Sequence, residues 1–336
     1  MKVLFIGGTG IISSACSELA LAQGMDLFLL NRGESSRPIP EGATVLHGDI
    51  RDPGSVREAL GELKFDVVVN WVAFTPEHIE TDLELFAGRT KQYVFISSAS
   101  AYQKPLGHLP ITESTPLHNP FWPYSRDKIA CEDRLTRAYR EDGFPATIVR
   151  PSHTYDRTLL PMDGGWTVVD RMRRGKPVIV HGDGTSLWTL THHRDFAVGF
   201  VGLLGRPAVV GEAVQITGDE WLTWNQIFEL VAGAAGAEAN IVHVPSDIIA
   251  AFAPDWGAGL LGDKAHSVIF DNSKIKRLVP EFRATIPYAR GVQEVLAWYD
   301  ADPARQVVNA ELERVMDDII GQIQGVGPRR SGAVDI

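Results

Sequence analysis

The sequence predicts an α/β fold in which a doubly wound parallel sheet is followed by a smaller C-terminal α/β domain. Strand-like apolar runs alternate with helical runs through residues 1–155, as is typical of such a sheet. The first apolar run ends in a glycine-rich turn that opens a helix. Beyond residue 155 the loops lengthen and aromatic residues become frequent. We therefore assign residues 156–325 to a second domain, with some later elements returning to the first, and residues 326–336 to a flexible tail.

The pattern of apolar residues gives each element of the first domain. Continuous apolar runs between glycine, proline or polar residues indicate buried parallel strands, and helical spacing indicates the intervening helices. Asp52 before Pro53 is a typical helix start. The expected strands are residues 3–6, 26–31, 44–49, 65–73, 92–100 and 145–151, and the expected helices are residues 13–23, 52–63, 75–88 and 124–141. In the second domain, helical runs are expected at residues 224–236 and 289–323.

Composition excludes several classes of protein. The chain has 336 residues, of which 44% are hydrophobic, and a net charge of −10. That acidic balance argues against sequence-independent nucleic-acid binding, which depends on neutralising phosphates. Cys16 and Cys131 are the two cysteines, so neither a disulfide framework nor a cysteine metal site is expected, and a reducing cytoplasm is the simplest location. The apolar run at residues 3–6 is too short to span a membrane.

The glycine-rich turn in "FIGGTGIISS" carries the first functional signal. Gly7 and Gly10 allow a tight turn and a close approach of the backbone to a pyrophosphate. The next helix attracts that group through its free N–H groups and its dipole. Ser13 occupies the position of the usual third glycine and is also small. The turn therefore predicts a Rossmann-type dinucleotide site, contacted by Gly7, Thr9, Gly10, Ile11 and Ile12.

The choice between the two nicotinamide dinucleotides depends on the end of the second strand, "LLNRGESSR". An acidic residue there would hold the ribose 2′-hydroxyl of NAD, but this chain has Asn31 and Arg32. An arginine attracts a 2′-phosphate and can bond it through two nitrogens. We therefore favour NADP over NAD. The alternative is that Arg32 is solvated and Asn31 simply bonds the ribose. At the end of the third strand, Asp49 and Ile50 are expected to contact the adenine.

Tyr124 and Lys128 are the candidate catalytic pair. They lie four residues apart in "YSRDK", which is one helical turn, so they share a helix face. An ammonium beside a phenol favours the phenolate and lowers the pKa of the phenol from about 10. Such a phenol can exchange a proton with a substrate oxygen. The same spacing also arises by chance, so the pair needs support from the rest of the sequence.

Together these motifs resemble the extended short-chain dehydrogenase/reductases, specifically the NAD-dependent epimerase/dehydratase family. The resemblance covers nearly the whole chain, through "GGTGIIS", "HGDIRD", "VFISSASAY", "YSRDK" and "IVRPSHTY". It implies that Tyr124 is the acid/base, that Lys128 also bonds the nicotinamide ribose, and that Ser98 bonds the reacting oxygen. Further dinucleotide contacts are expected from Trp71, Val72, Ala73, Lys128 and Pro151. The chain is also distantly similar to chloroplast stem-loop RNA-binding proteins.

Several positions depart from the family pattern. Ala99 and Ser100 replace the acidic pair of sugar 4,6-dehydratases, so that reaction is not expected. In the degraded motif "GDGTSLWTLTHHRDF", Trp188 stands where nucleotide-sugar epimerases place a diphosphate-binding arginine, and Arg194 is a nearby substitute. With Trp166, Phe121 and Trp122, Trp188 either lines a sugar-stacking pocket or packs between domains. The candidate substrate contacts are Ser98, His153, Trp188 and Arg194.

Metal binding is not predicted. His192 and His193 resemble a ligand pair, but neighbours on a strand point to opposite faces. No cysteine or acidic cluster completes a site in the sequence around them.

Three functions stay open. The first is an NAD(P)-dependent epimerase of a sugar or nucleotide sugar, which oxidises a hydroxyl transiently and returns the hydride to the other face. The second is an NADPH-dependent carbonyl reductase or alcohol dehydrogenase, which Arg32 favours. The third is a non-catalytic dinucleotide- or RNA-binding protein, against which the net charge and the Tyr124–Lys128 pair argue. By analogy with the family, a homodimer is expected through the helices at residues 76–86 and 124–140.

Overall fold

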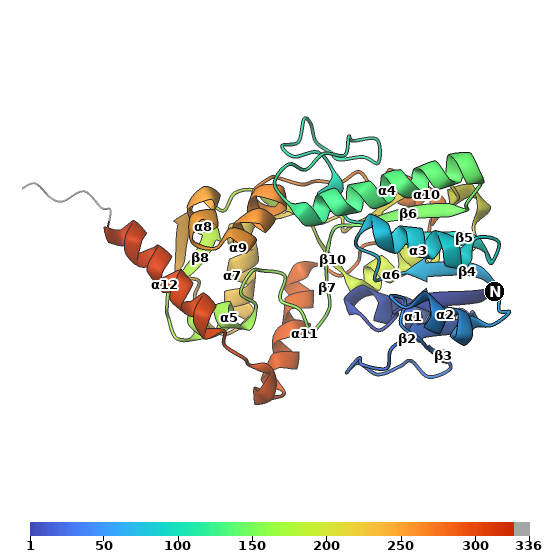
Figure 1. Ribbon diagram of the computed structural model, residues 1–336. Coiled ribbons are helices and arrows are strands. Elements are labelled where there is room, and N and C mark those ends of the chain that lie inside the picture. Colours follow the sequence, from blue (N-terminus) through green and yellow to red (C-terminus); the bar gives the residue numbers. More distant parts are fainter. Residues whose placement is uncertain (326–336) are drawn as a thin grey trace, which may run out of the picture.

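A computed structural model describes residues 1–325, so the tail predicted at residues 326–336 lies outside the described residues. A seven-stranded parallel sheet lies at one end of an elongated molecule (Figure 1). Its order, β11-β6-β5-β4-β1-β2-β3, reverses between β1 and β4. The strands are β1 (Lys2–Ile6), β2 (Asp26–Asn31), β3 (Thr44–His47), β4 (Phe65–Asn70), β5 (Thr90–Ile96), β6 (Ala146–Pro151) and β11 (Ala213–Ile216). The predicted Rossmann-type fold class is confirmed.

Helices cover both faces of this sheet because its strands are apolar on both sides. Val3 and Phe5 of β1 pack on one face, whereas Leu4 and Ile6 pack on the other. The first face is covered by α1 (Ile11–Ala22), α6 (His193–Val201) and α10 (Ser273–Leu278). The second is covered by α2 (Pro53–Leu60), α3 (Pro76–Phe86) and α4 (Pro123–Asp142). The helices α6 and α10 and the strand β11 therefore return to the sheet from the second half of the chain.

The rest of the second half packs around its own hydrophobic cluster at the other end of the molecule (Figure 1). Its strands are β7 (His153–Tyr155), β8 (Val178–His181), β9 (Leu187–Trp188), β10 (Leu190–His192), β12 (Leu222–Thr223) and β13 (Ile241–Val244), paired β7 with β10, β9 with β12 and β8 with β13. Its helices are α5 (Trp166–Arg173), α7 (Trp224–Ala234), α8 (Ser246–Phe252), α9 (Pro254–Gly259), α11 (Tyr288–Asp300) and α12 (Ala310–Gly325). Short helical turns are η1 (Ala99–Ala101), η2 (Pro207–Val209), η3 (Leu260–Lys264) and η4 (Pro303–Arg305). The exact domain boundary stays a prediction.

Several elements are shorter than predicted or divided, and in three of them the local reason is clear. β4 ends at Asn70, whose side-chain oxygen accepts a hydrogen bond from the Val72 N–H at 2.8 Å and turns the chain out of the sheet. β5 ends at Ile96, and Ser98 then caps η1 by accepting from the Ser100 N–H at 3.1 Å. The helical run predicted at residues 289–323 is divided, because Pro303 starts η4 between α11 and α12.

A buried ion pair joins α4 to β6 beneath the ends of the strands. The guanidinium of Arg150 contacts both carboxylate oxygens of Glu132, with the shortest distance at 2.5 Å. The Ser97 hydroxyl donates to the same carboxylate at 2.5 Å. Because all three side chains are buried, this cluster fixes the strand ends from which the site is built. Within residues 1–325, no helix combines the length and apolar character needed to cross a membrane.

Candidate active site

Two cavities lie at the carboxyl ends of the strands, on either side of the point where the strand order reverses. One, of about 500 Å³, is lined by residues that follow β1, β2 and β3, and we call it the β2–β3 cavity. The other, of about 340 Å³, lies between the sheet and the second half of the chain, and we call it the central cavity. Phe74 lines both, so the two cavities adjoin. This edge is where open α/β sheets bind ligands.

The glycine turn requires glycine at two adjacent positions. Gly7 and Gly8 have φ angles of +95° and +100°, and a Cβ on Gly8 would lie 2.7 Å from the side chain of Leu29. Gly10 differs, since its φ of −82° is open to other residues, although a Cβ there would lie 3.1 Å from Ser13 Oγ; its predicted approach to a pyrophosphate stays a prediction. Ser13, in place of a third glycine, accepts a hydrogen bond from the Gly10 N–H at 2.7 Å. The serine therefore helps to hold the turn.

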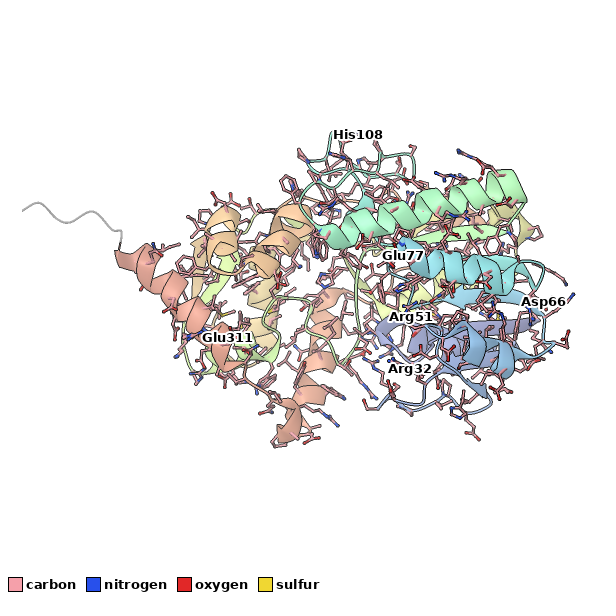
Figure 2. All side chains as sticks on the ribbon, viewed as in Figure 1. Arg32, Arg51, Asp66, Glu77, His108 and Glu311 are labelled. Carbon is pink, nitrogen blue, oxygen red and sulfur yellow. The ribbon has the colours of Figure 1, made fainter. Side chains whose placement is uncertain are left out.

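The β2–β3 cavity has two arginines at its wall. Arg32 is exposed and pairs with Glu34 at 2.9 Å and with Asp49 at 3.9 Å. Arg51, which we did not predict, also lines the cavity and donates to the Val72 carbonyl. Burial lowers the pKa of Arg51, and Figure 2 shows both arginines at the same end of the sheet, opposite Asp66. The sequence "GDIRD" could have indicated this role, because Arg51 directly follows Asp49 and Ile50, the two residues expected to contact the adenine.

The predicted dinucleotide contacts divide between the cavities. Six line the β2–β3 cavity: Gly7, Asn31, Arg32, Asp49, Ile50 and Val72. Four line the central cavity: Ile12, Trp71, Lys128 and Pro151. Neither cavity is lined by Thr9, Gly10, Ile11 or Ala73. The side chains of Thr9 and Ala73 are buried in the fold. Ala73 instead contributes its carbonyl oxygen, which accepts from Lys128.

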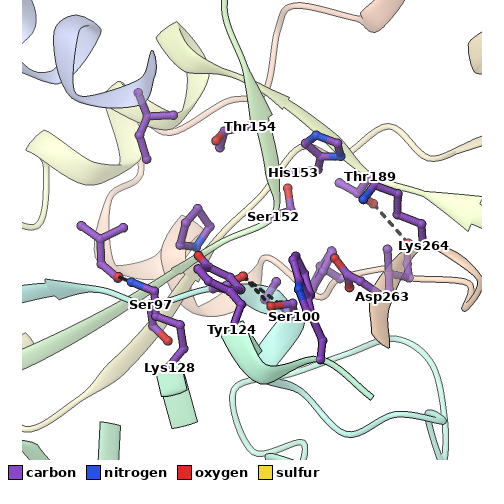
Figure 3. Close-up of a pocket in the computed structure, with 18 of the residues that line it drawn as sticks. Ser97, Ser100, Tyr124, Lys128, Ser152, His153, Thr154, Thr189, Asp263 and Lys264 are labelled. Carbon is purple, nitrogen blue, oxygen red and sulfur yellow. Dashed lines mark hydrogen bonds between the residues drawn. The ribbon is translucent and has the colours of Figure 1, made fainter. Parts of the chain in front are cut away.

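Tyr124 and Lys128 lie on the first turns of α4 and both face the central cavity (Figure 3). The ammonium of Lys128 is buried and donates to the carbonyls of Ala73 and Ile96, each at 2.7 Å. It lies 5.7 Å from the centre of the Tyr124 ring. These bonds tie the helix to the ends of β4 and β5, so the lysine holds Tyr124 at the edge of the sheet.

The pKa of Tyr124 differs from the expectation. We expected Lys128 to lower it, but burial raises the pKa of Tyr124 to about 12. The Ser98 hydroxyl lowers this pKa and the negative charge of Asp263 raises it. Burial is the larger effect, and Lys128 does not offset it because its ammonium is directed to two carbonyls; burial also lowers the pKa of Lys128, to about 8. Tyr124 is therefore a proton donor at neutral pH in this state.

Ser98 belongs to a chain of hydroxyl groups at the cavity wall. Its oxygen lies 2.9 Å from that of Ser100, which accepts from the Ser125 hydroxyl at 2.8 Å. The neighbouring Ser97 is committed to the buried Glu132, so Ser98 is the serine left for a ligand. Ser100 stands where dehydratases are expected to have an acid, and here it orients Ser98. We had predicted neither Ser100 nor Ser125 as part of the site.

The predicted substrate residues do not all reach the central cavity. His153 and Trp188 line it, and the Trp188 indole N–H donates to His153 Nδ1 at 3.1 Å. Trp188 is buried and packs against Trp224, and it fixes the position of the His153 ring. Burial lowers the pKa of His153 to about 3, which keeps its ring neutral. Contrary to expectation, Arg194 is directed to Glu294, at 2.5 Å, and lines neither cavity.

The other aromatic and histidine candidates are also resolved. Trp122 lines the central cavity, but Phe121 is exposed beside His266 and Trp166 stacks on Tyr299 in the second hydrophobic cluster. His192 ends β10 and His193 begins α6, so their rings do not alternate as on a strand and lie 4.7 Å apart. His192 accepts from the Arg194 N–H at 3.3 Å as the cap of α6. Among residues 1–325, no three His, Cys, Asp or Glu side chains gather as metal ligands.

Two charged residues of the central cavity were missed altogether. Asp263 and Lys264, at the end of η3, face the cavity opposite Tyr124 and Lys128 (Figure 3). Nothing in the sequence "GLLGDKAH" distinguishes this segment from an ordinary surface loop. The structure brings it to the site because the Gly262 carbonyl of η3 accepts a hydrogen bond from the Asn119 side chain at 2.7 Å.

A family model described as "NAD dependent epimerase/dehydratase family" matches residues 3–217, from β1 to just beyond β11. The chain belongs to this family. The predicted resemblance is thereby confirmed, and the matched part contains the glycine turn, Ser98, Tyr124 and Lys128. Residues 218–325, which include Asp263 and Lys264, lie beyond the family match.

Three curated relatives show how varied the similarity is. A 2′-dehydrokanamycin reductase of Streptomyces kanamyceticus is 26% identical, covering 89% of this chain and 84% of its own. The chloroplast stem-loop binding protein of 41 kDa b of Arabidopsis thaliana is 28% identical, covering 72% of this chain and 65% of its own. A UDP-glucose 4-epimerase of Lactobacillus helveticus is 33% identical, but the match covers 45% of this chain and 51% of the epimerase.

Solved structures match the fold along most of the chain. The epimerase Mth375 of Methanothermobacter thermautotrophicus has a TM-score of 0.75 at 18% identity, covering 91% of this chain and 94% of its own. The UDP-glucose 4-epimerase of Bifidobacterium longum, solved with NAD+ and UDP, has a TM-score of 0.72 at 19% identity, covering 90% of this chain and 99% of its own. At these identities the likeness establishes the architecture of both halves.

Proposed function

We propose that the chain is an NAD(P)-dependent sugar epimerase, which interconverts a secondary alcohol and a ketone and returns the hydride within one turnover. The observation that carries the proposal is the convergence of Ser98, Tyr124 and Lys128 on the central cavity, beside the cavity formed by the glycine turn. Membership of the epimerase/dehydratase family supports it. A homodimer through α3 and α4, which pack against each other, and a cytoplasmic location stay predictions.

The residues present fit a nicotinamide dinucleotide. Gly7 and Gly8, with positive φ angles and no side chains, turn the chain just before α1, and the N-terminus of this helix favours a pyrophosphate. Asn31, Arg32 and Arg51 surround the place expected for the adenine ribose, and Lys128 lies at the other end. When bound, the dinucleotide accepts hydride from the carbinol carbon and supplies it to the ketone.

Proton transfer to and from the substrate oxygen is assigned to side chains of this protein. Tyr124 takes the proton of the substrate hydroxyl as the carbonyl forms, and gives it back when the carbonyl is reduced. Ser98 donates a hydrogen bond to the same oxygen and holds it against Tyr124. Lys128 fixes the helix through Ala73 and Ile96 and so holds Tyr124 at the wall of the central cavity. His153, neutral and held by Trp188, offers a further polar contact to the sugar.

A net NADPH-dependent reductase is the second candidate, and two observations favour it. Arg32 and Arg51 both line the β2–β3 cavity, where a 2′-phosphate would lie. The 2′-dehydrokanamycin reductase, which matches 89% of this chain, is a reductase by name. Both candidates use the same proton donor, so they differ in whether the dinucleotide leaves after each turnover. A non-catalytic RNA-binding role is not proposed, because it gives no use for the buried Lys128 beside Tyr124.

The test is to identify what the purified protein holds. The protein is denatured without added cofactor and any released dinucleotide is identified by mass, and fresh protein is then titrated with NADPH and NADH. We expect a tightly retained, largely oxidised dinucleotide if the enzyme is an epimerase. An empty protein that binds NADPH reversibly would support the reductase instead. If neither dinucleotide is bound or retained, both enzyme proposals are wrong.

Replacing Arg32 by alanine should lower the affinity for NADP(H) by at least about 10-fold, because a charge-assisted hydrogen bond contributes about 1.5–3 kcal/mol. Affinity for NAD(H), which lacks the phosphate, should change by less than about 3-fold on the same reasoning. Arg51→Ala should shift the same preference. Isothermal titration measures both affinities. The matched control is Arg57→Ala, since Arg57 lies nearby on α2 and pairs with the exposed Glu84 outside the cavity. Equal losses for NAD(H) and NADP(H) would contradict the assignment.

A further inference from the structure

Asp263 and Lys264 are held on a rigid backbone at the wall of the central cavity. The Lys264 carbonyl accepts three hydrogen bonds, from His181 Nε2 at 3.0 Å and from Ser186 Oγ and Trp224 Nε1 at 3.2 Å each. One residue before Asp263, the Gly262 carbonyl accepts from the Asn119 side chain at 2.7 Å. That amide also bonds the Ser100 carbonyl at 2.9 Å. The segment that carries Asp263 is therefore tied, through the Asn119 amide, to the loop that carries Ser98.

A buried lysine fixes the carboxylate of Asp263. The side chain of Lys104 is 0% exposed, and its Nζ lies 3.3 Å from Asp263 Oδ1. Among the described residues this ammonium has no partner of full hydrogen-bond geometry. A buried ammonium is costly without an opposite charge, so Lys104 stabilises a negative Asp263 at this place. Asp263 also lines the central cavity together with Tyr124, so a ligand in this cavity lies near both side chains (Figure 3).

The cations of the central cavity are already engaged. Lys128 donates to two carbonyls, and Lys264 lies 3.6 Å from Asp163. Arg194, the remaining candidate for a diphosphate, is directed to Glu294. Within the part of the chain that the structure describes, the lining of this cavity therefore offers no uncommitted arginine or lysine to a diphosphate. Asp263 would in addition repel such a group.

We infer that the substrate is an uncharged sugar without a nucleoside diphosphate, and that Asp263 is the residue that recognises it by accepting hydrogen bonds from its hydroxyl groups. The inference rests on the proposed function and names the substrate class of the same site. Ser152, His153 and Thr189 line the same wall and add polar contacts, and Trp122 adds an aromatic face for the C–H side of a sugar ring. Lys104 is a positioning residue that acts through Asp263.

The test compares two kinds of ligand on protein saturated with NADP+. Saturation-transfer difference NMR measures binding of four methyl pyranosides (gluco, galacto, manno and xylo) and, separately, of UDP. We expect at least one glycoside to bind and UDP not to compete with it. Asp263→Asn should weaken glycoside binding by about 10-fold or more, the loss of one charge-assisted hydrogen bond. Asp255→Asn, a surface carboxylate on the preceding α9, is the matched control and should leave binding unchanged.

Asp263→Asn leaves Lys104 buried without its counter-charge and could destabilise the fold. A second variant, Lys104→Met/Asp263→Asn, removes both charges and so controls for that loss of stability. It should melt near the wild type and still lose glycoside binding. Three results would overturn the inference: binding of UDP stronger than that of every glycoside, glycoside binding that survives both Asp263 variants, or no glycoside binding at all by the NADP+-bound protein. A protein that fails to bind NADP+ or NAD+ contradicts the proposed function itself, which is a separate outcome.

Discussion

Replacing Tyr124 by phenylalanine should lower kcat/KM by about 10³-fold, because a positioned acid/base contributes about 10²–10⁴ to such reactions. The ring and its contact with Trp122, whose centre lies 4.9 Å away, are retained. Affinity for NADP(H) should therefore stay within about 2-fold of the wild type, since the hydroxyl makes no contact that orders the β2–β3 cavity. Steady-state kinetics with the sugar that supports turnover, together with titration of NADPH, measures both quantities. Tyr139→Phe is the matched control, since Tyr139 is an exposed tyrosine of the same helix.

The same hypothesis predicts how the rate in each direction of the reaction depends on pH. Because burial raises the pKa of Tyr124 to about 12, the phenol is protonated throughout the physiological range. Ketone reduction, which uses the protonated form, should be nearly independent of pH between about 6 and 8. Alcohol oxidation uses the ionised form, whose fraction rises about 10-fold per pH unit below the pKa, so that direction should accelerate with pH. Equal pH profiles in both directions, or a Tyr124→Phe variant with near-normal turnover, would argue against Tyr124 as the acid/base.

Local pattern was enough to predict six of the seven strands of the sheet, though not β11, and to place Tyr124 and Lys128 on one helix face. Continuous apolar runs specify strands that are buried on both faces, and the four-residue spacing of Tyr124 and Lys128 needs one helix to bring them together. The glycine turn was predicted at the right place, but the pattern could not tell that Gly8, rather than Gly10, requires a positive φ. That depends on the close approach of Leu29 from the neighbouring strand, which is a tertiary contact.

The residues that were missed are those whose role comes from long-range packing. Lys104 in "QKPLGH" reads as a loop lysine, and its burial against Asp263 is decided by a segment far along the chain. The pKa of Tyr124 was predicted in the wrong direction for the same reason. The distance to Lys128 follows from helix geometry, but burial, the larger effect here, depends on the second half of the chain. The role of Trp188 likewise depends on its packing against Trp224, which its position in a sequence motif does not reveal.

Replacing Glu132 by alanine should lower the free energy of unfolding by about 3–5 kcal/mol, because it leaves the Arg150 guanidinium buried without its counter-charge. Both side chains are almost fully buried, and the Ser97 hydroxyl loses its acceptor as well. Urea denaturation followed by circular dichroism measures the change. Glu80→Ala is the matched control: Glu80 also makes a two-point contact with an arginine, Arg134, but at the surface. An exposed pair contributes about 0–1 kcal/mol, so this variant should be nearly as stable as the wild type.

The same comparison decides whether the buried cluster also supports the site. Ser97 adjoins Ser98, and Arg150 adjoins Pro151, and both neighbours line the central cavity. If the Glu132–Arg150 pair fixes these strand ends, Glu132→Gln, which keeps the size of the side chain and an oxygen for Arg150, should recover part of the stability lost by the alanine variant. If the pair also supports the site, Glu132→Ala should bind NADPH more weakly than the wild type, and Glu132→Gln should recover part of that affinity. If Glu132→Ala and Glu80→Ala cost the same, the pair is not the clamp that its burial indicates, and the strand ends must be held by the parallel sheet alone.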